Sequence, residues 1–166
     1  LTGEIKQDAG TVKLAHDLKV VRFEQDRSGL NKELSLRRTL GPDGDQVVYR
    51  NTAIHVAGWA RRFLFRPEQL DTPVKSLSGG EQARLLIAKL MLQPADILML
   101  DEPTNDLDID TLQVLEESLE DFPGAVMLVT HDRFMLDRVS TTILGLDGRG
   151  HGAYFASFEQ WEEFLK

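Results

Sequence analysis

The sequence predicts an α/β fold in which a mostly parallel sheet is flanked by helices. Two wholly apolar runs, residues 97–100 and 125–129, are too short for helices and suit strands that are buried on both faces. The connection between them, residues 101–124, carries helical spacing over residues 111–119. Its length is what a right-handed crossover between parallel strands requires. The two runs are therefore expected to lie in one sheet with their carboxyl ends at the same edge.

Composition is that of an ordinary globular protein and excludes several classes of function. The chain has 166 residues, of which 42% are hydrophobic and 28% charged. Its net charge of −8 leaves no broad basic field that would recruit nucleic acid by charge alone. The absence of cysteine excludes disulfides, thiolate metal sites and cysteine nucleophiles. Every apolar run is far shorter than the ~20 residues of a membrane span.

The first half is expected to contain a hairpin followed by helices. Apolar residues alternate loosely over residues 11–25, which predicts a hairpin that ends at Gln25. Residues 31–40 and 51–65 have helical spacing, with a Gly-Pro-Asp-Gly-Asp turn cluster between them. We interpret residues 30–70 as a small helical insertion.

The second half is expected to alternate helices and strands. A strong helix over residues 81–93 leads to the first apolar run, and a short helix opens at Asp132 after the second. Residues 141–146 are predicted to form one more strand, and glycines at alternate positions then predict a hairpin turn. An aromatic-rich helix over residues 154–165 ends the chain.

Two predicted strand ends carry polar residues in positions that chemistry can use. Asp101 and Glu102 directly follow the first apolar run, and because successive side chains alternate, one can reach a metal while the other faces a water. His131 follows the second run and is therefore expected at the same edge. This convergence predicts a site. The alternative is structural, with Asp101 and Asp132 as caps and His131 as a core histidine.

The segment Ser78-Gly79-Gly80-Glu81 has two compatible interpretations. As Ser-x-x-Glu it is a capping box at the start of a helix. As a glycine pair at a helix N-terminus it is an anion site, because free amides and the positive end of the helix dipole can approach a phosphate. The glycine pair favours the anion site, since a simple cap does not need two residues that each cost about 1 kcal/mol of helix propensity.

Four segments together resemble the second half of an ABC-type ATPase domain. They are Phe-Glu-Gln ending at Gln25, Leu-Ser-Gly-Gly-Glu at 77–81, Ile-Leu-Met-Leu-Asp-Glu-Pro-Thr-Asn-Asp-Leu-Asp at 97–108, and His131. Glutamate after Ser-Gly-Gly, and Glu-Pro-Thr-Asn ahead of Leu-Asp, resemble the ABC-F class, whose members carry two ATPase domains in one chain and no transmembrane part. Thr-Pro-Val at 72–74 resembles the C-terminal ATPase domain of Uup-like proteins.

The resemblance implies a partial P-loop NTPase domain in four parts. The parts are a hairpin with the Q-loop (1–30), a helical subdomain with the signature helix (31–93), the core with Walker B, D-loop and switch histidine (94–148), and a C-terminal hairpin and helix (149–166).

The resemblance also assigns ATP and Mg²⁺ as cofactors and names the residues around them. Gln25 matches the Q-loop glutamine, which contacts Mg²⁺ and senses the γ-phosphate. Asp101 matches the Walker B aspartate that supports Mg²⁺. Glu102 matches the general base that orients the attacking water, and His131 matches the switch histidine at the γ-phosphate.

A second set of matching residues implies contact with an opposing ABC domain. Ser78, Gly79, Gly80 and Glu81 match the signature, which grips the γ-phosphate of ATP held by that domain. Asp108 matches the D-loop aspartate at the interface between the two domains.

By resemblance, the chain belongs to a cytoplasmic ATPase that acts on ribosomes or translation and does not insert into membranes. The alternatives are an ATP-binding subunit of an ABC membrane transporter and a non-catalytic interaction domain. Glu81 and the pair Thr104-Asn105 favour the ABC-F class. The family's Walker A loop is missing, and the sequence contains no Gly-Lys pair. We therefore expect a fragment of a larger protein that alone binds little ATP, hydrolyses none and self-associates.

Overall fold

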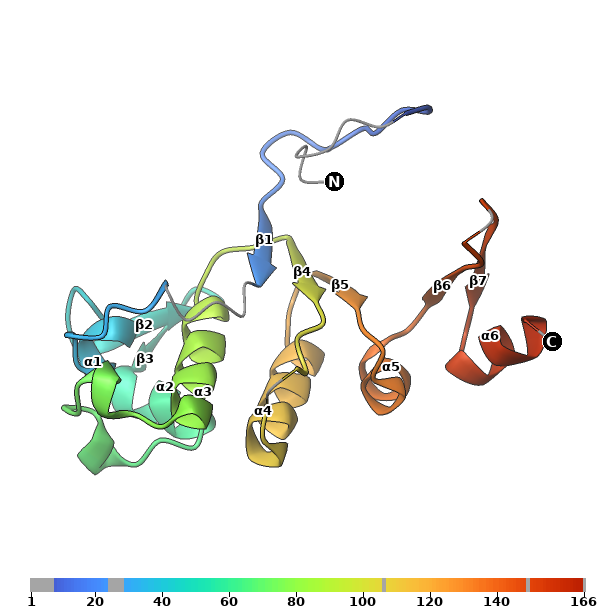
Figure 1. The fold of residues 1–166 in the computed structure, drawn as a ribbon. Coiled ribbons are helices and arrows are strands. Elements are labelled where there is room, and N and C mark those ends of the chain that lie inside the picture. The colour runs from blue at the N-terminus through green and yellow to red at the C-terminus, as the bar shows by residue number, and fades with distance from the viewer. Residues whose placement is uncertain (1–7, 24–28, 106, 149, 166) are drawn as a thin grey trace.

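A parallel sheet with strand order β1-β4-β5 forms the centre of the fold (Figure 1). The strands are β1 (Val20–Phe23), β4 (Ile97–Asp101) and β5 (Ala125–Val129). The predicted parallel pairing of the two apolar runs is confirmed, with Ile97 opposite Ala125 and Asp101 opposite Val129. This computed structural model describes residues 8–23, 29–105, 107–148 and 150–165.

Three helices lie next to the parallel strands in sequence, and a polar side chain caps the start of each. α3 (Gly79–Leu90) precedes β4, α4 (Ile109–Glu120) connects β4 to β5, and α5 (Arg133–Val139) follows β5. The N-caps are Ser78, Asp108 and Asp132, whose side chains accept hydrogen bonds from backbone amides of the first turn. None of the helices in the described part of the chain has the length and apolar character to cross a membrane.

Among the described residues the sheet packs on the hydrophobic core through one face only, which corrects the expectation of strands covered on both faces. Leu98 and Leu100 join the hydrophobic core, together with residues of α3 and α4. On the other face, Met99, Met127 and Val129 line an open cavity of about 210 Å³. Apolar runs are typical of parallel strands covered on both faces, but among the described residues only one face has such a cover.

The segment expected to be a helical insertion contains a β-hairpin. The segment begins with α1 (Leu36–Leu40), continues with the hairpin strands β2 (Gln46–Tyr49) and β3 (Thr52–His55), and leads into α2 (Val56–Arg62). Two 3-10 turns follow, η2 (Pro67–Gln69) and η3 (Val74–Ser76). Both helices are shorter than predicted, because Ser35 and His55 cap their starts. The hairpin reverses at Arg50 and Asn51, which both have positive φ, as a type I′ turn requires.

The hairpin predicted over residues 11–25 is wrong. β1 is the only strand that the structure describes there, and it pairs in parallel with β4 instead of with a neighbouring strand. Val12 and Leu14 are exposed, so the alternation that suggested a strand does not mark a buried face. Gln25 lies outside the described residues.

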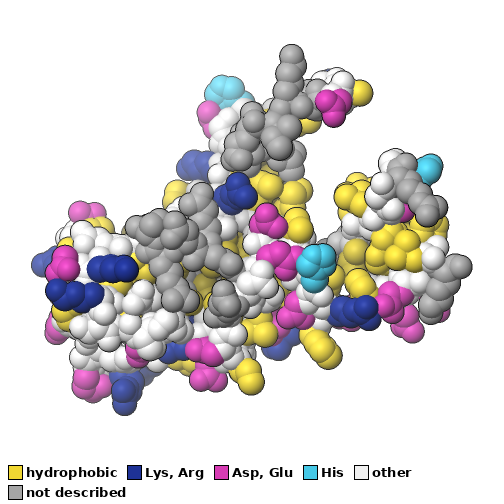
Figure 2. Space-filling model, viewed as in Figure 1, with side chains coloured by type: hydrophobic (Ala, Val, Ile, Leu, Met, Phe, Trp, Pro, Cys, Tyr) yellow, Lys and Arg dark blue, Asp and Glu magenta, His cyan; other side chains and the backbone are white. Residues whose placement is uncertain are grey.

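The C-terminal part is a separate hairpin packed on a helix. β6 (Ile143–Leu146) pairs antiparallel with β7 (Gly152–Phe155), which confirms the glycine-rich turn but sets β6 apart from the parallel sheet. The last helix, α6 (Phe158–Phe164), starts later than predicted because the preceding residues form β7. It packs Trp161 so closely on Gly145 that a Cβ there would overlap the indole ring. Figure 2 shows apolar side chains gathered over this hairpin.

The type I′ turn gives a test of the hairpin that the sequence did not predict. We expect Asn51→Val to lower the free energy of unfolding by about 1–2 kcal/mol, because a β-branched residue is strained at positive φ. Asn51→Gly is the control and should stay within about 0.5 kcal/mol of wild type. Urea unfolding measures both. Equal stability of the two variants would contradict the assigned turn.

Candidate nucleotide site

Asp101 presents an exposed carboxylate at the carboxyl end of β4. Its side chain is 60% exposed, and its Oδ2 lies 3.9 Å from Nη2 of Arg22, which β1 supplies from the adjacent strand. An ion pair of this length between exposed groups contributes little stability. The carboxylate therefore remains accessible to a ligand that approaches the strand ends.

Glu102 and His131 meet at the same edge, as the parallel topology predicts. Oε1 of Glu102 lies 3.4 Å from Nε2 of His131, and Oε2 accepts a hydrogen bond from the His131 amide at 3.4 Å. The Glu102 amide donates to the Val129 carbonyl at 2.7 Å, which fixes the backbone of Glu102 to the end of β5. The Glu102 side chain is 26% exposed, whereas that of His131 is 98% exposed.

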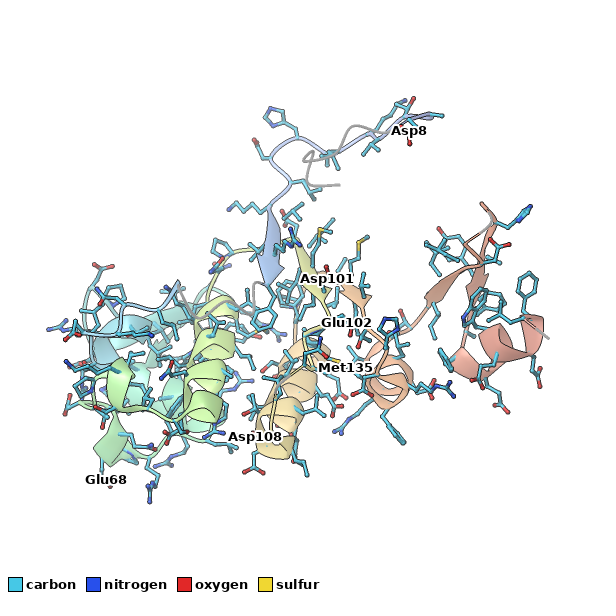
Figure 3. The ribbon with its side chains drawn as sticks, in the orientation of Figure 1. Asp8, Glu68, Asp101, Glu102, Asp108 and Met135 are labelled. Carbon is cyan, nitrogen blue, oxygen red and sulfur yellow. The ribbon has the colours of Figure 1, made fainter. Side chains whose placement is uncertain are left out.

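The backbone of Glu102 adopts a strained conformation. Its φ of 47° is in the left-handed region, which costs a residue with a Cβ about 1–2 kcal/mol. In Figure 3, Asp101 and Glu102 follow one another at the end of β4, where the chain turns away from the sheet. Figure 2 shows a histidine beside acidic side chains on this part of the surface. Strain of this kind clusters at functional sites.

The strand ends fit a Mg²⁺ site that a nucleotide would complete. Among the residues that the structure describes, no group of three or more histidine, cysteine, aspartate or glutamate side chains could hold a metal ion. Mg²⁺ commonly takes one or two carboxylates together with phosphate oxygens and waters. Asp101 can supply one such carboxylate. Gln25, the other predicted Mg²⁺ ligand, lies outside the part of the chain that the structure describes.

The N-terminus of α3 forms the predicted capping box. Ser78 Oγ accepts from the Glu81 amide at 3.3 Å, and Glu81 Oε2 accepts from the Ser78 amide at 2.8 Å. The hydrogen bond from the Ser78 backbone contributes most to lowering the pKa of Glu81 below its usual 4.5. The capping box therefore holds the Glu81 carboxylate at the start of α3, and its assignment as a nucleotide-binding residue stays a prediction. Ser78 and Gly79 are exposed.

Gly80 brings the signature segment against the start of α4. A Cβ on Gly80 would overlap Oδ2 of Asp108, whose Oδ1 accepts from the Thr111 amide at 2.8 Å. The side-chain and backbone hydrogen bonds of Thr111 lower the pKa of Asp108, so the cap is ionised at neutral pH. The close approach explains this glycine without a ligand.

Arg84 joins the same two helix ends and was missed by the sequence analysis. Its side chain is 12% exposed, and its Nη1 lies 3.3 Å from Oγ1 of Thr111 and 3.9 Å from Oδ1 of Asp108. The guanidinium also lies 5.9 Å from the ring centroid of Phe65. Its position one helical turn after Glu81 was the available signal, but the surroundings of the side chain depend on tertiary packing.

The predicted residues thus form two groups. Asp101 lies at the sheet edge where Glu102 contacts His131, whereas Gly80 of the signature segment lies against Asp108 at the start of α4. Figure 3 places Asp108 at the end of α4 that is remote from Asp101 and Glu102. The assigned roles of these residues stay predictions. Comparison with known proteins shows the family of the chain.

Residues 1–105 match the ABC transporter family. The chain belongs to this family. It is 47% identical over 151 residues to the ATP-binding protein Uup of Caulobacter vibrioides, and this similarity covers 90% of the chain and 25% of Uup. It is 36% identical over 167 residues to the energy-dependent translational throttle protein EttA of Escherichia coli, and this similarity covers 100% of the chain and 30% of EttA. The recognition of an ABC-F type ATPase domain is confirmed.

Solved structures support the same fold. A model of ribosome-bound archaeal Pelota and ABCE1 contains a chain with a TM-score of 0.65 and 27% identity. That similarity covers 98% of this chain and 28% of the other. The α/β class with a parallel sheet flanked by helices is therefore the fold of an ABC ATPase domain, and this chain spans less than a third of each relative named here.

The contact between Gly80 and Asp108 predicts that the effect of Gly80→Ala on the free energy of unfolding depends on whether Asp108 is present. In the wild-type protein, Gly80→Ala should lower the free energy of unfolding by about 1 kcal/mol, because the new Cβ displaces Asp108 from the Thr111 amide. In an Asp108→Ala background the same change should be neutral or stabilising, since alanine favours helix. Urea unfolding of the four proteins measures this.

A second glycine provides the control. Gly58 in α2 has only an ordinary contact at 3.8 Å to a side-chain carbon of Ile54, so Gly58→Ala should not destabilise. Equal destabilisation by Gly80→Ala in both backgrounds would show that Asp108 does not require the glycine.

Proposed function

We propose that this chain is the catalytic and signature-bearing part of an ATPase domain in a cytoplasmic ABC-F protein that acts on ribosomes or translation. The observation that carries the proposal is the contact between Glu102 and His131 at the carboxyl ends of paired parallel strands. ATP hydrolysis requires a positioned base and a polar partner at the γ-phosphate, and this edge of the sheet offers both.

The relatives favour the ABC-F class over a transporter subunit. EttA is named as a translational throttle protein, and its similarity extends over the full chain. The ABCE1 relative is described in a ribosome-bound state. Those descriptions apply to the relatives, and their extension to this chain is the proposal.

In the proposed reaction, Glu102 orients a water and accepts its proton. The His131 amide and imidazole hold the Glu102 carboxylate in place through both of its oxygens. With one side of the histidine fully exposed, the imidazole can also turn to a phosphate oxygen of a bound nucleotide. In this proposal Glu102 accepts the proton of the water, and His131 orients the Glu102 carboxylate.

Asp101 would hold Mg²⁺, which neutralises charge on the phosphate oxygens when it is bound. The remaining phosphate contacts need a Walker A loop, and the sequence has no Gly-Lys pair to provide one. We therefore propose that residues 1–166 alone do not hydrolyse ATP, and that turnover belongs to a full-length protein with two ATPase domains. The signature would then act on a nucleotide held by the opposing domain.

Replacing the proposed base tests this assignment in the full-length protein. Glu102→Gln should keep ATP binding within a few-fold and lower single-turnover hydrolysis by at least about 100-fold, because the amide keeps the shape but loses basicity. ATP binding and single-turnover rates are measured on the same preparation.

Glu116 in α4 provides a matched control, because it lies away from the strand ends. Its Oε2 pairs with Nη1 of Arg138 at 2.7 Å. Glu116→Gln should reduce stability and leave the hydrolysis rate per folded molecule close to that of wild type. Hydrolysis by Glu102→Gln at a near wild-type rate would remove Glu102 from the role of base.

A further inference from the structure

Gln69 connects the signature helix to the loop that precedes it. Its Nε2 donates to Oε1 of Glu81 at 2.5 Å, and its Oε1 accepts from the Arg66 amide at 2.9 Å. Gln69 lies at the end of η2, whereas Glu81 lies in the first turn of α3. The side chain therefore joins two elements through both ends of its amide.

This contact completes a chain of hydrogen bonds that ends at the signature. The Arg66 amide binds Gln69, Gln69 binds one oxygen of Glu81, and the other oxygen of Glu81 accepts from the Ser78 amide. A capping box needs only Ser78 and Glu81. Gln69 adds a second contact, so that each oxygen of the Glu81 carboxylate accepts a hydrogen bond. A carboxylate that is held at both oxygens cannot rotate into the space in front of Gly79 and Gly80.

The charge at this position makes the orientation of Glu81 important. A carboxylate near a helix N-terminus occupies the same electrostatic environment as a bound phosphate. The hydrogen bonds from Ser78 and Gln69 lower the pKa of Glu81 and so keep its carboxylate ionised. If Glu81 turned toward Gly79 and Gly80, its charge would repel an approaching phosphate.

We propose that Gln69 is a positioning residue that holds the Glu81 carboxylate against the Ser78 amide and so keeps the amides of Gly79 and Gly80 open to a nucleotide phosphate. The proposal rests on the proposed function, in which the signature contacts ATP on the opposing domain. Because that contact forms only when the domains close, Gln69 affects turnover more than initial ATP binding.

Exchange of the two side chains tests the proposal in the full-length protein. Gln69→Glu places two carboxylates face to face and should lower kcat by about tenfold while KM for ATP changes less than about twofold. The double exchange of Gln69→Glu with Glu81→Gln restores an amide opposite a carboxylate and should recover at least half of the wild-type kcat. Gln69→Met, which keeps the length of the side chain but removes its hydrogen-bond donor, should also lower kcat, because Glu81 then loses the contact that holds its Oε1.

Gln113 provides a matched control, because its Nε2 donates to Oε1 of Glu117 at 2.9 Å on the exposed side of α4. Gln113→Glu creates the same pair of carboxylates there and should leave kcat and KM unchanged. Thermal unfolding of every variant separates loss of turnover from loss of fold.

Two outcomes would overturn the proposal while the wild type remains active. One is a wild-type kcat for Gln69→Glu, and the other is a folded double exchange that does not recover. A wild-type full-length protein without ATPase activity would instead contradict the proposed function, and this inference with it.

Discussion

The parallel pairing of β4 with β5 determines the geometry of the candidate site. Because Asp101 lies opposite Val129, the chain leaves both strands at the same level. The Glu102 amide then donates to the Val129 carbonyl, and the residues that follow β5 bring His131 to the Glu102 carboxylate. A shift of register by one residue would move side chains to the opposite face of the sheet and separate this pair. Hydrophobic packing of Leu98 and Leu100 fixes that register.

A second constraint acts at the helix starts, where polar groups are packed without a ligand. Glycine at position 80 allows the α4 cap to contact the signature segment, and Arg84 lies between the two helix ends with little exposure. The negative charges of Glu81 and Asp108 stabilise the two helix N-termini, and both are ionised at neutral pH. The segment that carries Gly80 and the start of α4 are therefore packed against one another through Asp108 and Arg84.

Local patterns predicted the parts of the fold in which a single signal dominates. Apolar runs of four or five residues and a capping serine with glutamate three residues later identified β4, β5 and α3. The hairpin of β2 and β3 was missed because helical spacing over residues 51–65 outweighed the β-branched Val47 and Val48 and an uncommon Arg-Asn turn. Gln69 could not be predicted at all, since its partner Glu81 is brought near only by the folded loop. The one-sided cover of the sheet likewise depends on packing between distant segments.

A structure of the full-length Glu102→Gln variant with ATP and Mg²⁺ tests most directly whether this chain serves two nucleotides. We expect the γ-phosphate of one ATP beside Asp101 and His131, and the γ-phosphate of a second ATP, held by the opposing domain, within hydrogen-bond distance of the Gly79 and Gly80 amides. A structure in which the closed domains leave Gly79 and Gly80 facing solvent, or in which one nucleotide contacts both groups of residues, would contradict this division of roles.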